Sequence, residues 1–165
     1  MHYQVVVFDD EIGQAMEIES IAWKRFPSPD DQATFTDLDV YLGLCDSDEL
    51  ENNMDNNFIP GTMTSVLSSS SYTTDVVAVG DWYEITFTTP YWYNGQENLL
   101  IEINWSAGSG SLYSWSWQAE PNRRAYAHYG ETTARVLDNN VPTMQLSGTL
   151  ALDNSTFGRI KSLFD

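Results

Sequence analysis

Residues 82–88 read WYEITFT, and residues 99–105 read LLIEINW. In both stretches apolar side chains recur at every second position, which is the period of a strand that buries one face. Leu100, Glu102 and Asn104 take the opposite face of the second stretch, which we expect to be the outer one. The residues predicted to face inward are Tyr83, Ile85, Phe87, Leu99, Ile101, Ile103 and Trp105.

The same strand signals recur along the chain, between clusters of Gly, Pro, Asn, Asp and Ser. We predict strands at residues 3–8, 16–26, 36–44, 63–68, 82–88, 99–105, 112–118, 123–129 and 143–152. About nine short strands suit a sandwich of two sheets. The sequence therefore predicts an all-β fold, a two-sheet antiparallel β-sandwich. Residues 68–71 and 108–111 are expected to be short flexible connectors, and Ser47 is expected to start a helical turn.

The length and composition of the chain predict one domain. Its 165 residues lie within the usual size of a single domain, and apolar residues are spread from Tyr3 to Phe164 without a repeat or a shift in composition. We therefore predict a single β-sandwich domain over residues 1–165, with a tail at residues 156–165. In that tail Phe157, Ile160 and Leu163 fall at helical spacing, which predicts a short C-terminal helix.

Charge is the strongest compositional signal. The chain has 24 acidic residues against seven Lys plus Arg, a formal net charge of −17. Such a surface repels phosphate groups and anionic lipid, so we predict no nucleic-acid partner. No apolar run reaches the roughly 18 residues that span a bilayer, so we predict no membrane insertion. The acidic excess favours solubility, while high-salt adaptation and a role towards cations or a basic partner stay open.

Cys45 is the only cysteine, which excludes an internal disulfide and zinc sites built on cysteine pairs. Its apolar neighbours predict a small buried residue at a strand end. The apolar run at residues 4–8 is too short for a signal peptide and is followed at once by Asp9 and Asp10. An export signal is therefore expected to lie outside this numbering.

Four stretches together resemble a known family. They are EIESIAW at residues 17–23, LDVYLG at residues 38–43, WYEITFTTPYWYNG at residues 82–95 and NLLIEI at residues 98–103. They are similar to a jelly-roll-like β-sandwich domain of secreted bacterial surface and adhesin-type proteins, over about residues 12–106. The resemblance implies an extracellular or cell-surface module and supplies no catalytic residues.

Aromatic residues are candidates for sugar binding, because the faces of sugar rings stack on exposed Trp and Tyr side chains. Tyr113, Trp115 and Trp117 share one side of a predicted strand and would form a platform if that side were outside. Their alternation with Ser and Gln favours a position in the core. Trp92 and Tyr93, beside the Asn94–Gly95 turn, are better candidates for exposure, although one of them is expected to plug an edge of the sandwich.

A calcium site is a further possibility, because hard oxygen ligands suit Ca²⁺ and one polar loop is rich in carboxylates. The candidate ligands are Asp46, Asp48, Glu49, Glu51 and Asp55. The loop lacks the glycine and glutamate spacing of an EF-hand, so a solvated acidic loop is the favoured interpretation.

Catalysis has little support, because the chain has only two histidines and no spacing typical of a nucleophile beside a base. Self-association is favoured instead, since a sandwich has edge strands that can accept a strand from another chain. Residues 1–8 are the candidate exchanged strand, and an ordinary first strand of the same chain is the alternative. The residues predicted to take part are Tyr3, Gln4, Val5, Val6, Val7 and Phe8.

The sequence therefore predicts a non-catalytic extracellular structural protein, a surface filament or adhesin-like subunit that associates through edge strands and termini. The alternative is a carbohydrate-binding module that stacks glycans on exposed Trp and Tyr. No cofactor is predicted, and Ca²⁺ stays possible.

Overall fold

A computed structural model describes residues 1–150, and almost all regular structure in this part is β-strand. The predicted tail and C-terminal helix lie outside the described residues. The elements are β1 (His2–Val7), α1 (Asp9–Ile12), β2 (Met16–Phe26), β3 (Thr34–Cys45), the 3-10 helix η1 (Met54–Asn56), β4 (Thr64–Thr73), β5 (Trp82–Tyr93), β6 (Asn98–Asn104), β7 (Ala107–Ser109), β8 (Tyr113–Ser114), β9 (Ser116–Gln118), β10 (Arg124–Ala127), β11 (Val136–Asp138), β12 (Asn140–Pro142) and β13 (Met144–Leu150).

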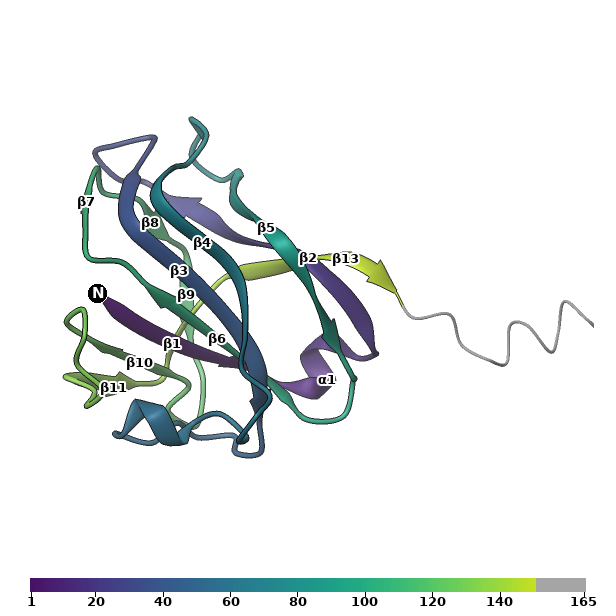
Figure 1. The fold of residues 1–165 in the computed structure, drawn as a ribbon. Coiled ribbons are helices and arrows are strands. Elements are labelled where there is room, and N and C mark those ends of the chain that lie inside the picture. The colour runs from purple at the N-terminus through teal and green to yellow at the C-terminus, as the bar shows by residue number, and fades with distance from the viewer. Residues whose placement is uncertain (151–165) are drawn as a thin grey trace, which may run out of the picture.

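The strands form an antiparallel sandwich (Figure 1). The first sheet has the order β11-β10-β1-β6-β3-β4, with β7 also paired to β3. The second has the order β13-β2-β5, with β8 also paired to β2, and β9 and β12 form a separate ribbon. All of these pairings are antiparallel. The predicted all-β sandwich is therefore confirmed.

Three local predictions are wrong. Residues 68–71 are part of β4, because each of Ser68, Ser69 and Ser71 pairs with a residue of β3. The predicted strand at 112–118 is divided, since β8 pairs with β2 while β9 pairs with β12. The helical turn begins near Met54 rather than at Ser47, whose hydroxyl instead donates to the carbonyl of Glu49.

The main core lies between the two sheets, and it contains the predicted inward positions. Ile85 and Phe87 of β5 face Leu99, Ile101 and Ile103 of β6, all of them buried. Tyr83 and Trp105 are only partly buried at one end of the same cluster. Alternation therefore identified the inner face of both strands.

The outer face of the first sheet is also covered, contrary to the prediction for Leu100 and Glu102. Residues 46–63 cross this face, and the amide N–H of Leu50 donates to the carbonyl of Asn122 at 3.0 Å. Both β6 side chains are consequently buried. The second cluster comprises Val6, Cys45, Leu50, Met54, Leu100, Ala125 and Ala127. Cys45 is buried as predicted, and this burial raises the pKa of its thiol.

Strand β1 lies in the middle of the first sheet, between β10 and β6 (Figure 1). Its register with β6 runs from the His2–Asn104 pair to the Val7–Leu99 pair. Val5 contributes to the main core and Val6 to the second cluster. Residues 1–8 thus contribute a strand to the sheet of their own chain. A strand from a second copy would make the same contacts, so strand exchange stays a prediction.

Arg123 fastens the end of β1 to the following helix. Its guanidinium donates to the carbonyl of Val6 and to both carboxylate oxygens of Glu11, and it lies 3.8 Å from the centre of the Phe8 ring. The side chain is almost fully buried. A buried guanidinium needs such partners, because its desolvation is otherwise uncompensated. The ion pair with Glu11 therefore fixes where the chain turns out of β1.

Deleting residues 1–8 tests the role of β1 directly. Since both neighbours of β1 and both hydrophobic clusters lose a partner, we expect global unfolding, seen by circular dichroism and size-exclusion chromatography. A folded product that has merely lost the ability to polymerise would show instead that the strand is dispensable for its own domain.

Candidate functional site

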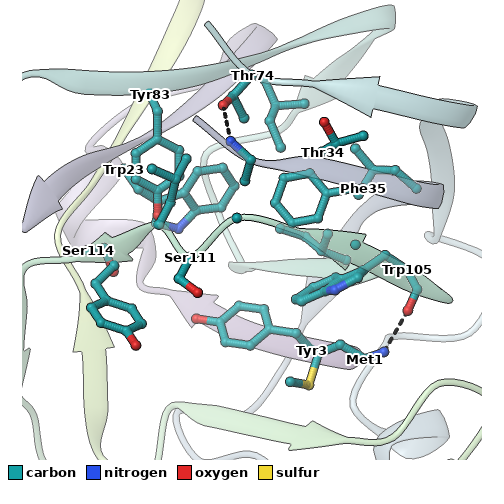
Figure 2. Close-up of a pocket in the computed structure, with 18 of the residues that line it drawn as sticks. Met1, Tyr3, Trp23, Thr34, Phe35, Thr74, Tyr83, Trp105, Ser111 and Ser114 are labelled. Atoms are coloured by element: carbon teal, nitrogen blue, oxygen red, sulfur yellow. Dashed lines mark hydrogen bonds between the residues drawn. The ribbon is translucent and has the colours of Figure 1, made fainter. Parts of the chain in front are cut away.

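A cavity of about 550 Å³ lies between the two sheets. Its volume is in the range of small-molecule sites, roughly 300–1,000 Å³. Side chains of β1, β2, β3, β5 and β6 line it together with residues 108–114. The aromatic residues that contribute are Tyr3, Trp23, Phe35, Tyr83, Trp105 and Tyr113. Figure 2 shows the first five of these rings arranged around the space.

Cross-strand pairing positions the rings. Trp23 of β2 pairs with Tyr83 of β5, and the two rings stack with their centres 5.6 Å apart. On the opposite sheet, Phe35 and Trp105 meet edge to face at 5.4 Å. Tyr3 enters from β1. Both sheets therefore supply aromatic walls, and the rings support one another.

A Gly- and Ser-rich segment forms one side of the cavity. Strand β3 pairs with β6 from Asp39 onward and with β7 up to Thr36. Between them Asp37 has a φ of 50°, a left-handed conformation that Asp tolerates better than most residues, and it accepts a hydrogen bond from the Ser106 hydroxyl at 2.7 Å. Because the partner of β3 changes from β6 to β7 at Asp37, the chain that follows β6 continues along one side of the cavity.

Gly110 allows this segment to approach β3 closely. Its φ is 81°, and a Cβ there would lie 2.4 Å from the carbonyl oxygen of Gln32. The next residue, Ser111, donates its N–H to a carboxylate oxygen of Asp30 at 2.8 Å. The predicted connector at 108–111 is therefore held in place by specific contacts.

The cavity lining has two cationic groups, Arg124 and the Met1 ammonium, which donates to the carbonyl of Trp105 at 2.6 Å. None of its lining residues is Asp or Glu, although the chain has 24 of them. Arg124 is at the margin and forms an ion pair with Asp138, with 2.7 Å between Nη2 and Oδ2. Burial raises the pKa of Tyr3, and it raises that of Tyr83 to about 12 despite a hydrogen bond with Ser114. Both phenols are therefore protonated at neutral pH and can donate hydrogen bonds.

An exposed aromatic platform lies on the outer face of the second sheet, beside this cavity. Phe26 pairs across the strands with Tyr113, and it contacts Trp115 edge to face at 4.6 Å. Lys24 pairs with Trp82 and its ammonium lies 5.9 Å from the centre of that ring. Cross-strand partners share a face, so these side chains lie together. We define the platform as Phe26, Trp82, Tyr113 and Trp115; each ring is at least 37% exposed.

Polar groups flank the platform. In the next row of the sheet, Ala22 lies between Glu84 of β5 and Gln145 of β13. Both of these longer side chains are exposed, and the Ser20 hydroxyl donates to Glu84. Carboxylate and amide groups beside stacking rings are suited to bind sugar hydroxyls.

The outcome for the five predicted aromatic residues is mixed. Tyr113, Trp115 and Trp117 are 54%, 45% and 44% exposed, so the expectation that they face the core is wrong. The segment follows the rim of the sandwich, where neither side of it is buried. Trp92 is exposed as expected, whereas Tyr93 is fully buried and donates its hydroxyl to the carbonyl of Glu97 at 2.7 Å. Tyr93 is thus the ring that plugs an edge.

The structure unites only part of this set. Tyr113 and Trp115 lie in the platform, while Trp117 pairs with Val141 in the separate ribbon and lies 5.3 Å from the Arg123 guanidinium. Trp92 pairs with Glu17 at the other end of β5. Phe26 and Trp82 were not predicted. Phe26 lies two residues from Lys24, and Trp82 lies two residues from Glu84, which places both on the polar side of their strands and was a usable signal. The pairing of Phe26 with Tyr113 and of Trp82 with Lys24 was not visible from the sequence.

The acidic loop does not converge on one point. Asp48 accepts from the Asn98 amide, Glu49 from Asn122 and Glu51 from Asn56. Within residues 1–150, no group of three or more His, Cys, Asp or Glu side chains is placed to hold a metal ion. Asp46 and Asp55 are therefore not part of such a group either. Calcium binding by this loop stays a prediction, and no cluster of ligands among the described residues supports it. In the same part of the chain, no helix is long and apolar enough to cross a membrane.

A second set of buried polar residues lies under the acidic loop. The Glu102 carboxylate accepts from Gln4 at 2.6 Å and from Asn104 at 2.8 Å, and it lies 3.1 Å from Nε2 of His2. The other ring nitrogen, Nδ1, donates to the carbonyl of Glu131 at 2.7 Å. Both nitrogens thus face oxygen acceptors, as in a doubly protonated imidazole.

These contacts shift the pKa values of both His2 and Glu102. Burial alone would lower the pKa of His2, but the hydrogen bonds and the negative charge of Glu102 raise it overall. Burial alone would raise the pKa of Glu102, but the hydrogen bonds from His2 and Gln4 lower it overall. The charged pair is therefore favoured in the folded state.

Comparison of the chain with protein-family models, curated proteins and solved structures finds no match. The resemblance to surface domains is therefore supported by the quoted residues alone, and the function has to be argued from the site.

The His2–Glu102 pair predicts a pH optimum of stability. The His2 contribution is complete below its ordinary pKa of 6.5 and is lost as the pH rises through its higher folded value. The Glu102 contribution is complete above 4.5 and is lost as the pH falls through its lower folded value. Urea unfolding should therefore show stability decreasing above about pH 6.5, less steeply in His2→Gln. The exposed His128→Gln variant is the matched control, and equal slopes in the two variants would refute the pair.

Proposed function

We propose that the chain is a non-catalytic, extracellular glycan-binding domain that uses the aromatic platform. The observation that carries this proposal is the clustering of four exposed rings on one face of the second sheet, held by cross-strand pairs. Solvent-exposed aromatic rings in such a cluster are seldom needed for folding, and a large exposed apolar patch is typical of a binding surface. The resemblance to secreted surface domains supports an extracellular location.

Charge and geometry narrow the class of glycan. The net charge of −17 disfavours polymers that carry carboxylate or sulfate groups. A neutral glycan avoids this repulsion, and its hydroxyls find Lys24, Glu84 and Gln145 beside the rings. The rings come from β5, β2 and β8 with the residue after it, and neighbouring strands lie about 4.8 Å apart, which favours an oligosaccharide over a monosaccharide.

Binding to an array of neutral oligosaccharides tests the platform. Trp115→Ala should weaken binding about tenfold, which corresponds to about 1.4 kcal/mol and is expected from the loss of one stacking ring. Trp92→Ala is the matched control, because it removes another exposed Trp, at the other end of β5, and should leave affinity unchanged. Equal loss in the two variants, or no binding by the wild-type chain, would contradict the proposal.

Self-association through edge strands is a second candidate, as in a surface filament or adhesin-like subunit. It is favoured by the composition of β13, which lies at the end of its sheet and contains no charged residue. Strand β4 also lies at the end of its sheet and is uncharged, but it packs against β5, whose Thr88 hydroxyl donates to the carbonyl of Val66 at 3.0 Å. Natural edge strands are usually protected by charge, and this chain has many acids that it does not place there. Uncharged edges in a strongly acidic protein leave a route for strand pairing between copies.

Charge placed on an edge strand tests this route. The double variant Ser147→Lys and Thr149→Lys in β13 should abolish assemblies seen by negative-stain microscopy and keep the monomer folded. Gln118→Lys adds charge to the short ribbon instead and should assemble normally. Wild-type chains that stay monomeric at every concentration tested would contradict self-association through edge strands.

A further inference from the structure

The cavity between the sheets has a different chemistry from the platform, and it points to a different ligand. Its walls combine stacked and edge-to-face rings with the side chains of Leu38, Ile85 and Ile103. The polar side-chain groups along it are the hydroxyls of Ser, Thr and Tyr and the indole N–H groups of Trp23 and Trp105, in addition to the paired Arg124. Amide and carboxylate side chains are absent from its lining within the described residues.

This lining disfavours a sugar. A buried sugar residue presents several hydroxyls, and each one left without a partner costs about 1–3 kcal/mol. Sites that enclose sugars therefore need several amide or carboxylate groups, and those of this molecule lie outside the cavity, beside the platform. An apolar ring meets no such penalty against Trp23, Phe35 and Trp105.

The lining also disfavours an ion. An anion would have to enter a protein of net charge −17. It would find Arg124 already paired with Asp138 and the Met1 ammonium bonded to the carbonyl of Trp105. A cation could stack on the rings, but Arg124 lies beside them and no carboxylate of the lining would neutralise it. A neutral molecule is therefore the ligand that the electrostatics allow.

One polar group in the cavity is placed to orient such a molecule. The Tyr3 ring points into the space with its hydroxyl on the side where Ser111 and Ser114 lie (Figure 2). No residue of 1–150 forms a hydrogen bond with this hydroxyl, and burial raises its pKa, so it remains a proton donor. Tyr3 is only partly buried, so this hydroxyl stays open to the cavity and can donate to a bound molecule.

From these observations we propose that the cavity is a second binding site, which shares only Tyr113 with the glycan platform. Its ligand is an uncharged, apolar, ring-shaped small molecule that carries one hydroxyl or carbonyl group. The rings of Trp23, Phe35, Tyr83 and Trp105 enclose the apolar part, and the Tyr3 hydroxyl donates to the polar group. Residues 107–111 form the side past which the molecule enters.

Four probes of one shape test this charge and hydroxyl selectivity by calorimetric titration of the full chain at pH 7. They are 2-naphthol, naphthalene, 2-naphthoate and 2-naphthyltrimethylammonium. We expect 2-naphthol to bind at least tenfold more tightly than either charged probe. Equal affinity for the neutral and charged probes, or no binding of any probe, would overturn the proposal.

Two variants locate the binding. Tyr3→Phe removes only the hydroxyl and should weaken 2-naphthol about fivefold, as expected for one hydrogen bond, without affecting naphthalene. Ser111→Trp should fill the cavity and abolish binding of both, with the fold checked by circular dichroism. Trp92→Ala, which changes an exposed ring far along β5, should bind like the wild type, and loss of binding there would place the probe on the surface.

Binding at the platform and binding in the cavity can be tested separately. Trp115→Ala should reduce glycan binding and leave 2-naphthol binding intact, whereas Tyr3→Phe should do the reverse. Loss of both glycan binding and 2-naphthol binding in either variant would mean that the two ligands share one site. That result would overturn the proposal of a second site.

Discussion

The burial of the Glu102 carboxylate in the outer face of the first sheet is the interaction on which the rest of the architecture depends. A carboxylate in this position is tolerated only when its oxygens are hydrogen-bonded, and removal of one partner of a buried pair costs about 3–5 kcal/mol. Gln4, Asn104 and His2 supply the partners. The contacts tie β1 to β6, and His2 adds the turn that contains Glu131.

The same polar residues also hold the loop that covers the outer face of the first sheet, so both faces of this sheet are covered. The Gln4 amide also donates to the carbonyl of Met54 and accepts from Asn57, so the loop that covers the second cluster is fixed by the same residues. With β1 and β6 held in register, Tyr3 and Ile103 pair and face the cavity together. The position of the cavity wall therefore follows from polar contacts on the other side of the sheet.

Much of the fold could be predicted from alternation, because alternation reports which side of a strand is buried. It identified Ile85, Ile101 and Ile103 as inner residues. It could not show that Leu100 and Glu102 are buried as well, since a charged residue on the second face is typical of an exposed one. The uninterrupted apolar run Val5-Val6-Val7 was the available sign of burial on both faces, because a strand covered on one side only rarely has three such residues in a row.

The candidate site was harder to predict, because it depends on which strands meet. Tyr113 and Trp115 were recognised as a pair, but alternation with serine assigned them to the core. Their exposure follows from pairing with the last residues of β2, a long-range contact that no local pattern encodes. The cavity was not predicted for the same reason, since its rings come from five strands and each ring alone looks like an ordinary core residue.

The distribution of charge connects these features. The chain has 24 acidic residues, but none lines the cavity, and none lies in strands β4 and β13. Charge repulsion between copies is long-ranged and is screened within about 10 Å at 0.1 M salt, whereas stacking on a ring acts only at contact. Salt should therefore promote contact between uncharged edges while leaving the capture of neutral ligands unchanged. In the proposed functions, the net negative charge therefore limits which molecules approach the chain, and its uncharged surfaces are the ones that make contact.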